Sequence, residues 1–124
     1  MEDLRPRLPA DDLTPDAAEK LSRFHADVVS EVQRALAEHP LVVVGMAQNP
    51  HVKKVRRALK EAGIEVFYLE YGSYFAKWKE RLAIKLWSGW PTFPQVFVKG
   101  KLVGGEDLTK AAIADGRLKK WLEG

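Results

Sequence analysis

The chain has 124 residues, of which 46% are hydrophobic and 30% are charged, and its formal net charge is +3. This length suits one globular domain, and so modest a charge argues against a dedicated nucleic-acid binder. The absence of cysteine excludes disulfide formation, thiolate ligation of a metal and catalysis by a thiol.

The first fourteen residues predict an irregular arm, because they combine prolines with mixed charge. We therefore place one domain over residues 15–124. Thr14, Pro15 and Asp16 form a typical helix start, with a capping hydroxyl, a proline at the first position and an acid in the first turn. Apolar residues at helical spacing then predict a single helix to about Glu38; they are Leu21, Phe24, Val28, Val32, Ala35 and Leu36.

Two strands alternate with two helices in the middle of the chain. Leu41–Val44 is a short β-branched run, typical of a central strand buried on both faces. Asn49 and Pro50 suit a helix start, and Gly63 suits its end. The expected inward residues of that helix are Val52, Val55 and Leu59. A strand at Ile64–Leu69 and a helix at Tyr74–Trp87 follow, the helix with Phe75, Trp78, Leu82 and Leu86 inward.

Residues 89–107 read G-W-P-T-F-P-Q-V-F-V-K-G-K-L-V-G-G-E-D and predict a β-hairpin. Prolines fix the backbone before a buried strand at Val96–Val98, and Lys99-Gly100 supplies the turn into a second strand at Leu102 and Val103. The glycine pair 104–105 then leads into a helix at Asp107–Ala114, and a last helical piece covers Gly116–Leu122. This order of elements predicts an α/β fold.

The hairpin resembles that of the glutaredoxins, and its W-P-T-F-P-Q and G-G-x-D segments resemble the monothiol branch with a Cys-Gly-Phe-Ser site. The resemblance extends from about residue 29 to residue 122. It implies a thioredoxin-like fold, with a mixed four-stranded sheet flanked by helices on both faces and a cis bond at Pro94. It also implies a site that holds glutathione and, in that branch, an iron–sulfur cluster.

The resemblance places Asn49 where the family has its reactive cysteine, and Met46 where the family usually has a lysine. It also implies a glutathione groove, with backbone contacts from Thr92, Phe93 and Pro94. The γ-glutamyl end of the tripeptide is expected at Gly105, Glu106 and Asp107, and its glycyl carboxylate at Arg81 and Lys85. Cations at one end and an acid at the other suit a zwitterionic tripeptide.

Each of these residues also has an ordinary structural explanation. Asn49 suits a helix cap, Asp107 complements a helix dipole, and Arg81 and Lys85 fit a solvated face. The three histidines lack metal-ligand spacing, so no metal site is predicted. The cations of the second helix are more typical of a solvated face than of a nucleic-acid site.

Three functions follow from these observations. The first is a cysteine-free glutaredoxin relative that exchanges no disulfides and ligates no cluster through its own residues, yet keeps a glutathione groove. The second is an interaction module without a small-molecule ligand, for which the resemblance implies an iron–sulfur or BolA-type partner. The third is an electron-carrying glutaredoxin in redox homeostasis, which lacks the residue for a mixed disulfide. No apolar run approaches the roughly 18 residues of a membrane span, so we expect a cytoplasmic protein.

Overall fold

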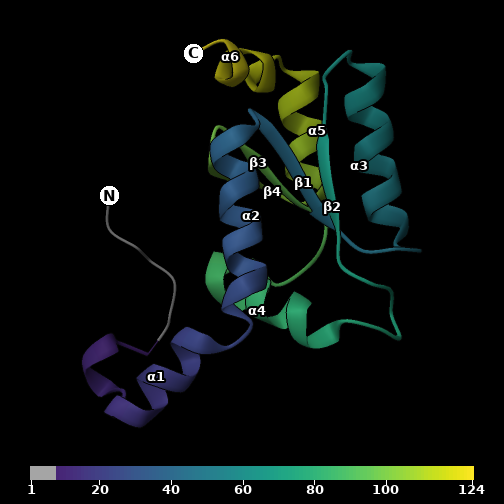
Figure 1. Ribbon diagram of the computed structural model, residues 1–124. Coiled ribbons are helices and arrows are strands. Elements are labelled where there is room, and N and C mark those ends of the chain that lie inside the picture. Colours follow the sequence, from purple (N-terminus) through teal and green to yellow (C-terminus); the bar gives the residue numbers. More distant parts are fainter. Residues whose placement is uncertain (1–7) are drawn as a thin grey trace.

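The computed structural model describes residues 8–124, and its centre is a four-stranded sheet (Figure 1). The strands lie in the order β2-β1-β3-β4. β1 pairs parallel with β2 and antiparallel with β3, and β3 pairs antiparallel with β4. The mixed sheet expected from the resemblance is therefore confirmed. The strands are β1 (Leu41–Gly45), β2 (Phe67–Glu70), β3 (Gln95–Val98) and β4 (Lys101–Gly104).

Helices cover both faces of this sheet (Figure 1). One layer contains α2 (Ala26–Glu38) and α4 (Trp78–Ser88), and the other contains α3 (Pro50–Glu61) with α5 (Glu106–Ala114) and α6 (Arg117–Glu123). A 3-10 turn η1 (Ala10–Asp12) and α1 (Pro15–Arg23) precede them. Within the described residues, no helix is long and apolar enough to cross a membrane.

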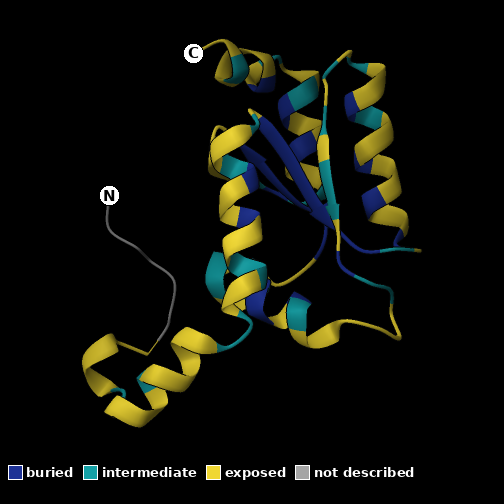
Figure 2. Cartoon of the chain, in the orientation of Figure 1, coloured by how far each residue is buried: buried dark blue, intermediate teal, exposed yellow. Residues whose placement is uncertain are grey.

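β1 is the centre of the hydrophobic core, as its β-branched sequence predicts. All five of its residues are buried (Figure 2). Val42 and Val44 pack with α2 and α4, whereas Leu41 and Val43 pack with α3, α5 and α6. The alternation arises because successive side chains of a strand point to opposite faces of the sheet.

The single helix expected from Pro15 to Glu38 is wrong, because the structure has two helices there. α1 ends at Arg23 and α2 begins at Ala26. Between them, His25 adopts a left-handed conformation with φ of 46°. The sequence pattern does not reveal this break, because the apolar residues keep the spacing of one continuous helix on both sides of it. Of the arm expected at 1–14, residues 1–7 lie outside the described part, and residues 10–12 form η1.

The burial predicted for the helix at Tyr74–Trp87 is also wrong. Its helix α4 begins later, at Trp78, after Lys77 in a left-handed conformation. Phe75 is 94% exposed, and Trp78, Leu82 and Leu86 are exposed as well. The side chains that α4 buries are Arg81, Ala83 and Ile84. Leu86 instead lines a cavity of about 780 Å³ that α4 shares with α1, α2 and the residues before α1.

The second half of the chain agrees more closely with its sequence pattern. The peptide bond between Phe93 and Pro94 is cis, as expected. Lys99 and Gly100 both have positive φ, which fits the predicted two-residue turn between β3 and β4. The helices after the hairpin lie within one residue of their predicted bounds. β2, however, begins at Phe67 rather than Ile64.

Candidate functional site

The first turn of α3 is capped by a side chain of the chain itself. Asn49 is the N-cap residue and is only 7% exposed. Its Oδ1 accepts hydrogen bonds from the backbone N–H groups of His51 (2.8 Å) and Val52 (3.2 Å). Pro50 occupies the first helical position and has no N–H. Since a helix start leaves its first N–H groups without intrahelical partners, Asn49 satisfies two donors that would otherwise face a ligand.

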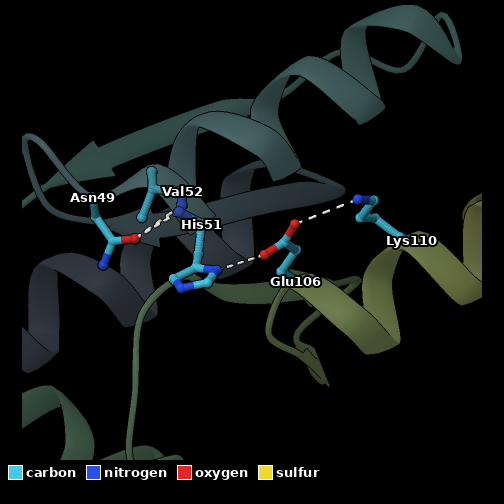
Figure 3. Close-up of polar contacts among 5 residues, drawn as sticks. All are labelled: Asn49, His51, Val52, Glu106 and Lys110. Carbon is cyan, nitrogen blue, oxygen red and sulfur yellow. Dashed lines mark hydrogen bonds and ion pairs between the residues drawn. The ribbon is translucent and has the colours of Figure 1, made fainter.

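The first turn of α5 lies next to that of α3 (Figure 3). Its N-cap residue, Gly105, offers no side-chain cap. Glu106 bridges the two helices, because one carboxylate oxygen lies 2.6 Å from Nδ1 of His51 and the other 3.4 Å from Nζ of Lys110. The bond to His51 is the main cause that lowers the pKa of Glu106, with a smaller contribution from Lys110.

The segment around cis Pro94 lies against the start of α5. Phe93, Pro94 and Gln95 are buried, whereas Thr92 is exposed. Nε2 of Gln95 donates to the carbonyl oxygen of Trp90 at 3.0 Å, which holds the segment between them in a loop. A Cβ added at Gly105 would lie 3.5 Å from both the carbonyl oxygen of Pro94 and Nε1 of Trp90. A Cβ at this position would therefore make only ordinary van der Waals contacts, so the approach of this segment to the helix start does not depend on the glycine.

The two cations expected in the groove differ in their surroundings. Lys85 is partly exposed, and its Nζ lies 5.7 Å from the centre of the Phe93 ring, beside the cis-proline segment. Arg81 is only 7% exposed, and its Nη1 donates to the carbonyl oxygens of Tyr71 (3.0 Å) and Ala76 (2.5 Å). The expectation that Arg81 is free to hold a ligand carboxylate needs correction, because its guanidinium supports the loop before α4.

The structure thus brings several of the expected residues together. The carbonyl oxygen of Pro94 lies beside Gly105, and Nζ of Lys85 lies beside the ring of Phe93. Asp107 is exposed in the first turn of α5. Met46 is buried in the core, so the position where the family usually has a lysine carries no charge.

His51 is the residue that the sequence pattern missed. The three histidines show no common spacing, and His51 and Glu106 are 55 positions apart. The resemblance places each residue at the start of a helix, but it does not by itself predict a contact between them.

Comparisons with known proteins show the family of this chain. Residues 41–103 match the glutaredoxin family. A glutaredoxin-like protein of Dictyostelium discoideum is 48% identical over 105 residues, which cover 85% of each chain. The chain belongs to the glutaredoxin family. This glutaredoxin is also similar to a probable monothiol glutaredoxin of Rickettsia felis, with 38% identity over 57% of this chain and 65% of that protein.

A solved structure shares the fold of this glutaredoxin. The crystal structure of a buckwheat glutaredoxin–glutathione complex superposes with a TM-score of 0.69 and 24% identity, over 85% of this chain and 92% of the buckwheat chain. The thioredoxin-like fold is therefore confirmed. Within the described residues, no three His, Asp or Glu side chains are grouped as metal ligands would be.

Proposed function

We propose that this glutaredoxin binds glutathione noncovalently and carries out no thiol–disulfide exchange through its own residues. The observation that carries the proposal is the Asn49 cap. Its amide oxygen accepts hydrogen bonds from the backbone N–H groups of His51 and Val52. In a thiol enzyme of this kind, the same N–H groups would stabilise a thiolate. An amide is no redox nucleophile, so the helix start keeps its geometry without its reactivity.

The remaining parts of the groove support the binding half of the proposal. The backbone of Thr92, Phe93 and Pro94 would pair with the central residue of the tripeptide, next to Gly105 and the first turn of α5. Asp107 is available to the ligand's ammonium group, and Lys85 to its glycyl carboxylate. Each charged end of glutathione then meets its complement. The related buckwheat protein was solved with glutathione.

An iron–sulfur cluster does not fit these residues. Such clusters are held by cysteine thiolates, and none of the 124 residues is cysteine. The Asn49 oxygen at the corresponding position is already used by two backbone donors.

The BolA-type partner and the cytoplasmic location that the sequence analysis gave stay predictions.

The proposal is tested by titrating the ¹⁵N-labelled protein with reduced glutathione while amide shifts are followed. We expect saturable shifts at Thr92, Gly105 and Asp107 at millimolar or lower concentration, with Lys85→Glu weakening binding about tenfold. Lys79→Glu is the matched control, because it changes charge equally on the same helix without facing Phe93. A titration to about 10 mM without saturable shifts would exclude the groove.

The absence of thiol exchange is tested separately. In an insulin-reduction assay with glutathione, the protein should show no rate above background. A rate comparable to that of a cysteine-containing glutaredoxin would contradict the proposal even if glutathione binds.

A further inference from the structure

The outer side of α3 carries a concentrated positive charge. Lys53, Arg56, Arg57 and Lys60 are all exposed, whereas Val52, Val55 and Leu59 of the same helix are buried. Figure 2 shows that α3 has buried and exposed parts. We call these four residues the basic face. With Lys54 and the acid Glu61 included, α3 has five cations and one carboxylate, and its formal charge of +4 exceeds the net charge of +3 of the whole chain. The charge is therefore localised, and it lies on a regular element with fixed spacing.

The basic face borders a pocket with an aliphatic lining. The pocket has a volume of about 430 Å³ and is lined by Arg56, Arg57, Lys60, Ile64 and Val66. Ile64 and Val66 are partly exposed and lead into β2, the strand at one edge of the sheet. Cations thus lie on one side of the hollow and two aliphatic side chains on the other, and the exposed Glu65 stands between these two in the sequence.

The cations of this pocket are largely free to meet a partner. Within the part of the chain that the structure describes, the side chains of Arg57 and Lys60 form no ion pair or hydrogen bond. The guanidinium of Arg56 lies 3.9 Å over the centre of the Tyr68 ring, and the Tyr68 hydroxyl donates to Glu70 at 2.9 Å. Arg56 is therefore held in place by its stacking, while its edges remain available for hydrogen bonds.

We propose that the basic face and this pocket bind an acidic polypeptide segment in which carboxylates flank one aliphatic side chain. The carboxylates would pair with Arg57, Lys60 and Arg56, and the aliphatic side chain would contact Ile64 and Val66. Charge complementarity selects the acidic partner and gives it orientation. Because Ile64 and Val66 line the pocket, the segment also needs an aliphatic side chain between its carboxylates.

The same surface is less suited to nucleic acid. Proteins that bind single strands combine cations with aromatic rings on which bases stack. The ring beside the basic face, Tyr68, is covered by Arg56, and the residues that line the pocket are three cations and two aliphatic residues, with no aromatic ring among them. This surface is separate from the groove at Pro94, so the inference is independent of glutathione binding.

The test is a fluorescence-anisotropy titration of the full chain with a labelled synthetic peptide, Asp-Glu-Glu-Leu-Glu-Asp. We expect saturable binding that weakens at least about tenfold in Arg57→Glu/Lys60→Glu. The matched control is Lys119→Glu/Lys120→Glu, which reverses two exposed charges on α6 and should change the affinity less than about twofold. Circular dichroism confirms that both double variants are folded. No saturable binding, or equal weakening by both variants, would overturn the proposal.

Two further probes separate the roles of charge and pocket. A peptide with Ser in place of Leu should bind several-fold more weakly, and the amide signals of Ile64 and Val66 should shift with the original peptide only. Equal binding of the two peptides would overturn the role given to the pocket. A short single-stranded oligonucleotide that binds more tightly than the acidic peptide would overturn the choice of partner. None of these outcomes decides whether the protein binds glutathione, which is tested by a separate titration.

Discussion

α3 and α5 begin side by side and are joined by the His51–Glu106 contact, yet their first turns are satisfied in opposite ways. At α3, the Asn49 side chain caps two backbone donors. At α5, Gly105 offers no side-chain cap, and the acids Glu106 and Asp107 follow it. Both starts have the dipole and the N–H groups that attract an anion. The chain therefore caps one helix start with its own side-chain oxygen and leaves the other without a side-chain cap.

Replacing the cap by a thiol should reverse this difference most completely. In Asn49→Cys, the helix start should lower the pKa of the new thiol below its usual value of about 8.5. The thiolate would attack oxidised glutathione, form a mixed disulfide and release one glutathione thiolate. Mass spectrometry at neutral pH should show the adduct forming at least about tenfold faster than in Ser30→Cys, an exposed thiol on α2. Equal rates would show that the start of α3 no longer activates a nucleophile.

Replacing Arg81, which supports the loop beside the start of α3, should have the next largest effect. Arg81 holds the loop that begins at Tyr71, and Gly72 of that loop accepts the backbone N–H of Ala47 at 2.7 Å, just before the cap. Arg81→Met leaves two carbonyl oxygens without their charged donor. It should lower the free energy of unfolding by about 2–3 kcal/mol, measured by urea denaturation. Lys79→Met should change it by less than about 0.5 kcal/mol, and an equal loss would refute this role for Arg81.

Small substitutions at the two N-cap residues should separate stability from binding. Asn49→Ala removes the acceptor of two N–H groups and should cost about 1 kcal/mol, with little effect on glutathione affinity. Gly105→Ala should cost less than about 0.5 kcal/mol, because its Cβ would make only ordinary contacts. Its methyl group would nevertheless stand where a ligand approaches the backbone, so affinity should fall. Unfolding curves paired with glutathione titrations check both variants, and loss of affinity in Asn49→Ala alone would contradict the assignment.

The contact between the two helix starts should have the smallest effect, and it should depend on pH. The pKa of Glu106 is lowered from its ordinary value of 4.5, chiefly by His51. The carboxylate therefore stabilises the folded state above that value, and this contribution disappears as the pH falls through the lowered pKa. Glu106→Gln should be less stable than the wild type by under about 1 kcal/mol at pH 6, and by a smaller amount at pH 3. Urea denaturation at both values, repeated in a His51→Gln background, should show the difference shrink.

The sequence predicted best where its residues have few conformational choices. Four consecutive β-branched or aliphatic residues defined β1, and Asn49-Pro50, Lys99-Gly100 and the glycine pair marked element boundaries. These signals arise from local sterics and capping, which the tertiary structure seldom overrides. The glutaredoxin resemblance then supplied the topology, which local signals do not contain.

The predictions that were wrong depended on which surface a helix meets. α4 carries large apolar residues on more than one side, so its sequence fits several rotations about the helix axis. The structure buries Ile84 and Ala83 and leaves Leu86 to line the cavity beside α1. The sequence suggested that Arg81 is a solvated or ligand-facing cation. In the structure its guanidinium is buried and donates to the carbonyl oxygens of Tyr71 and Ala76, and the sequence does not show where such a loop lies. The His51–Glu106 contact was missed for the same reason, since it joins distant positions.

The amide at the start of α3 also determines what kind of information this glutaredoxin can respond to. A cysteine at a helix start is oxidised or reduced with its surroundings, so its occupancy follows the ambient potential. Asn49 has no such couple, because the side chain that accepts the N–H groups of His51 and Val52 is an amide and not a thiol. Under the proposed function, a groove beside it would follow the concentration of reduced glutathione by noncovalent binding, without a mixed disulfide.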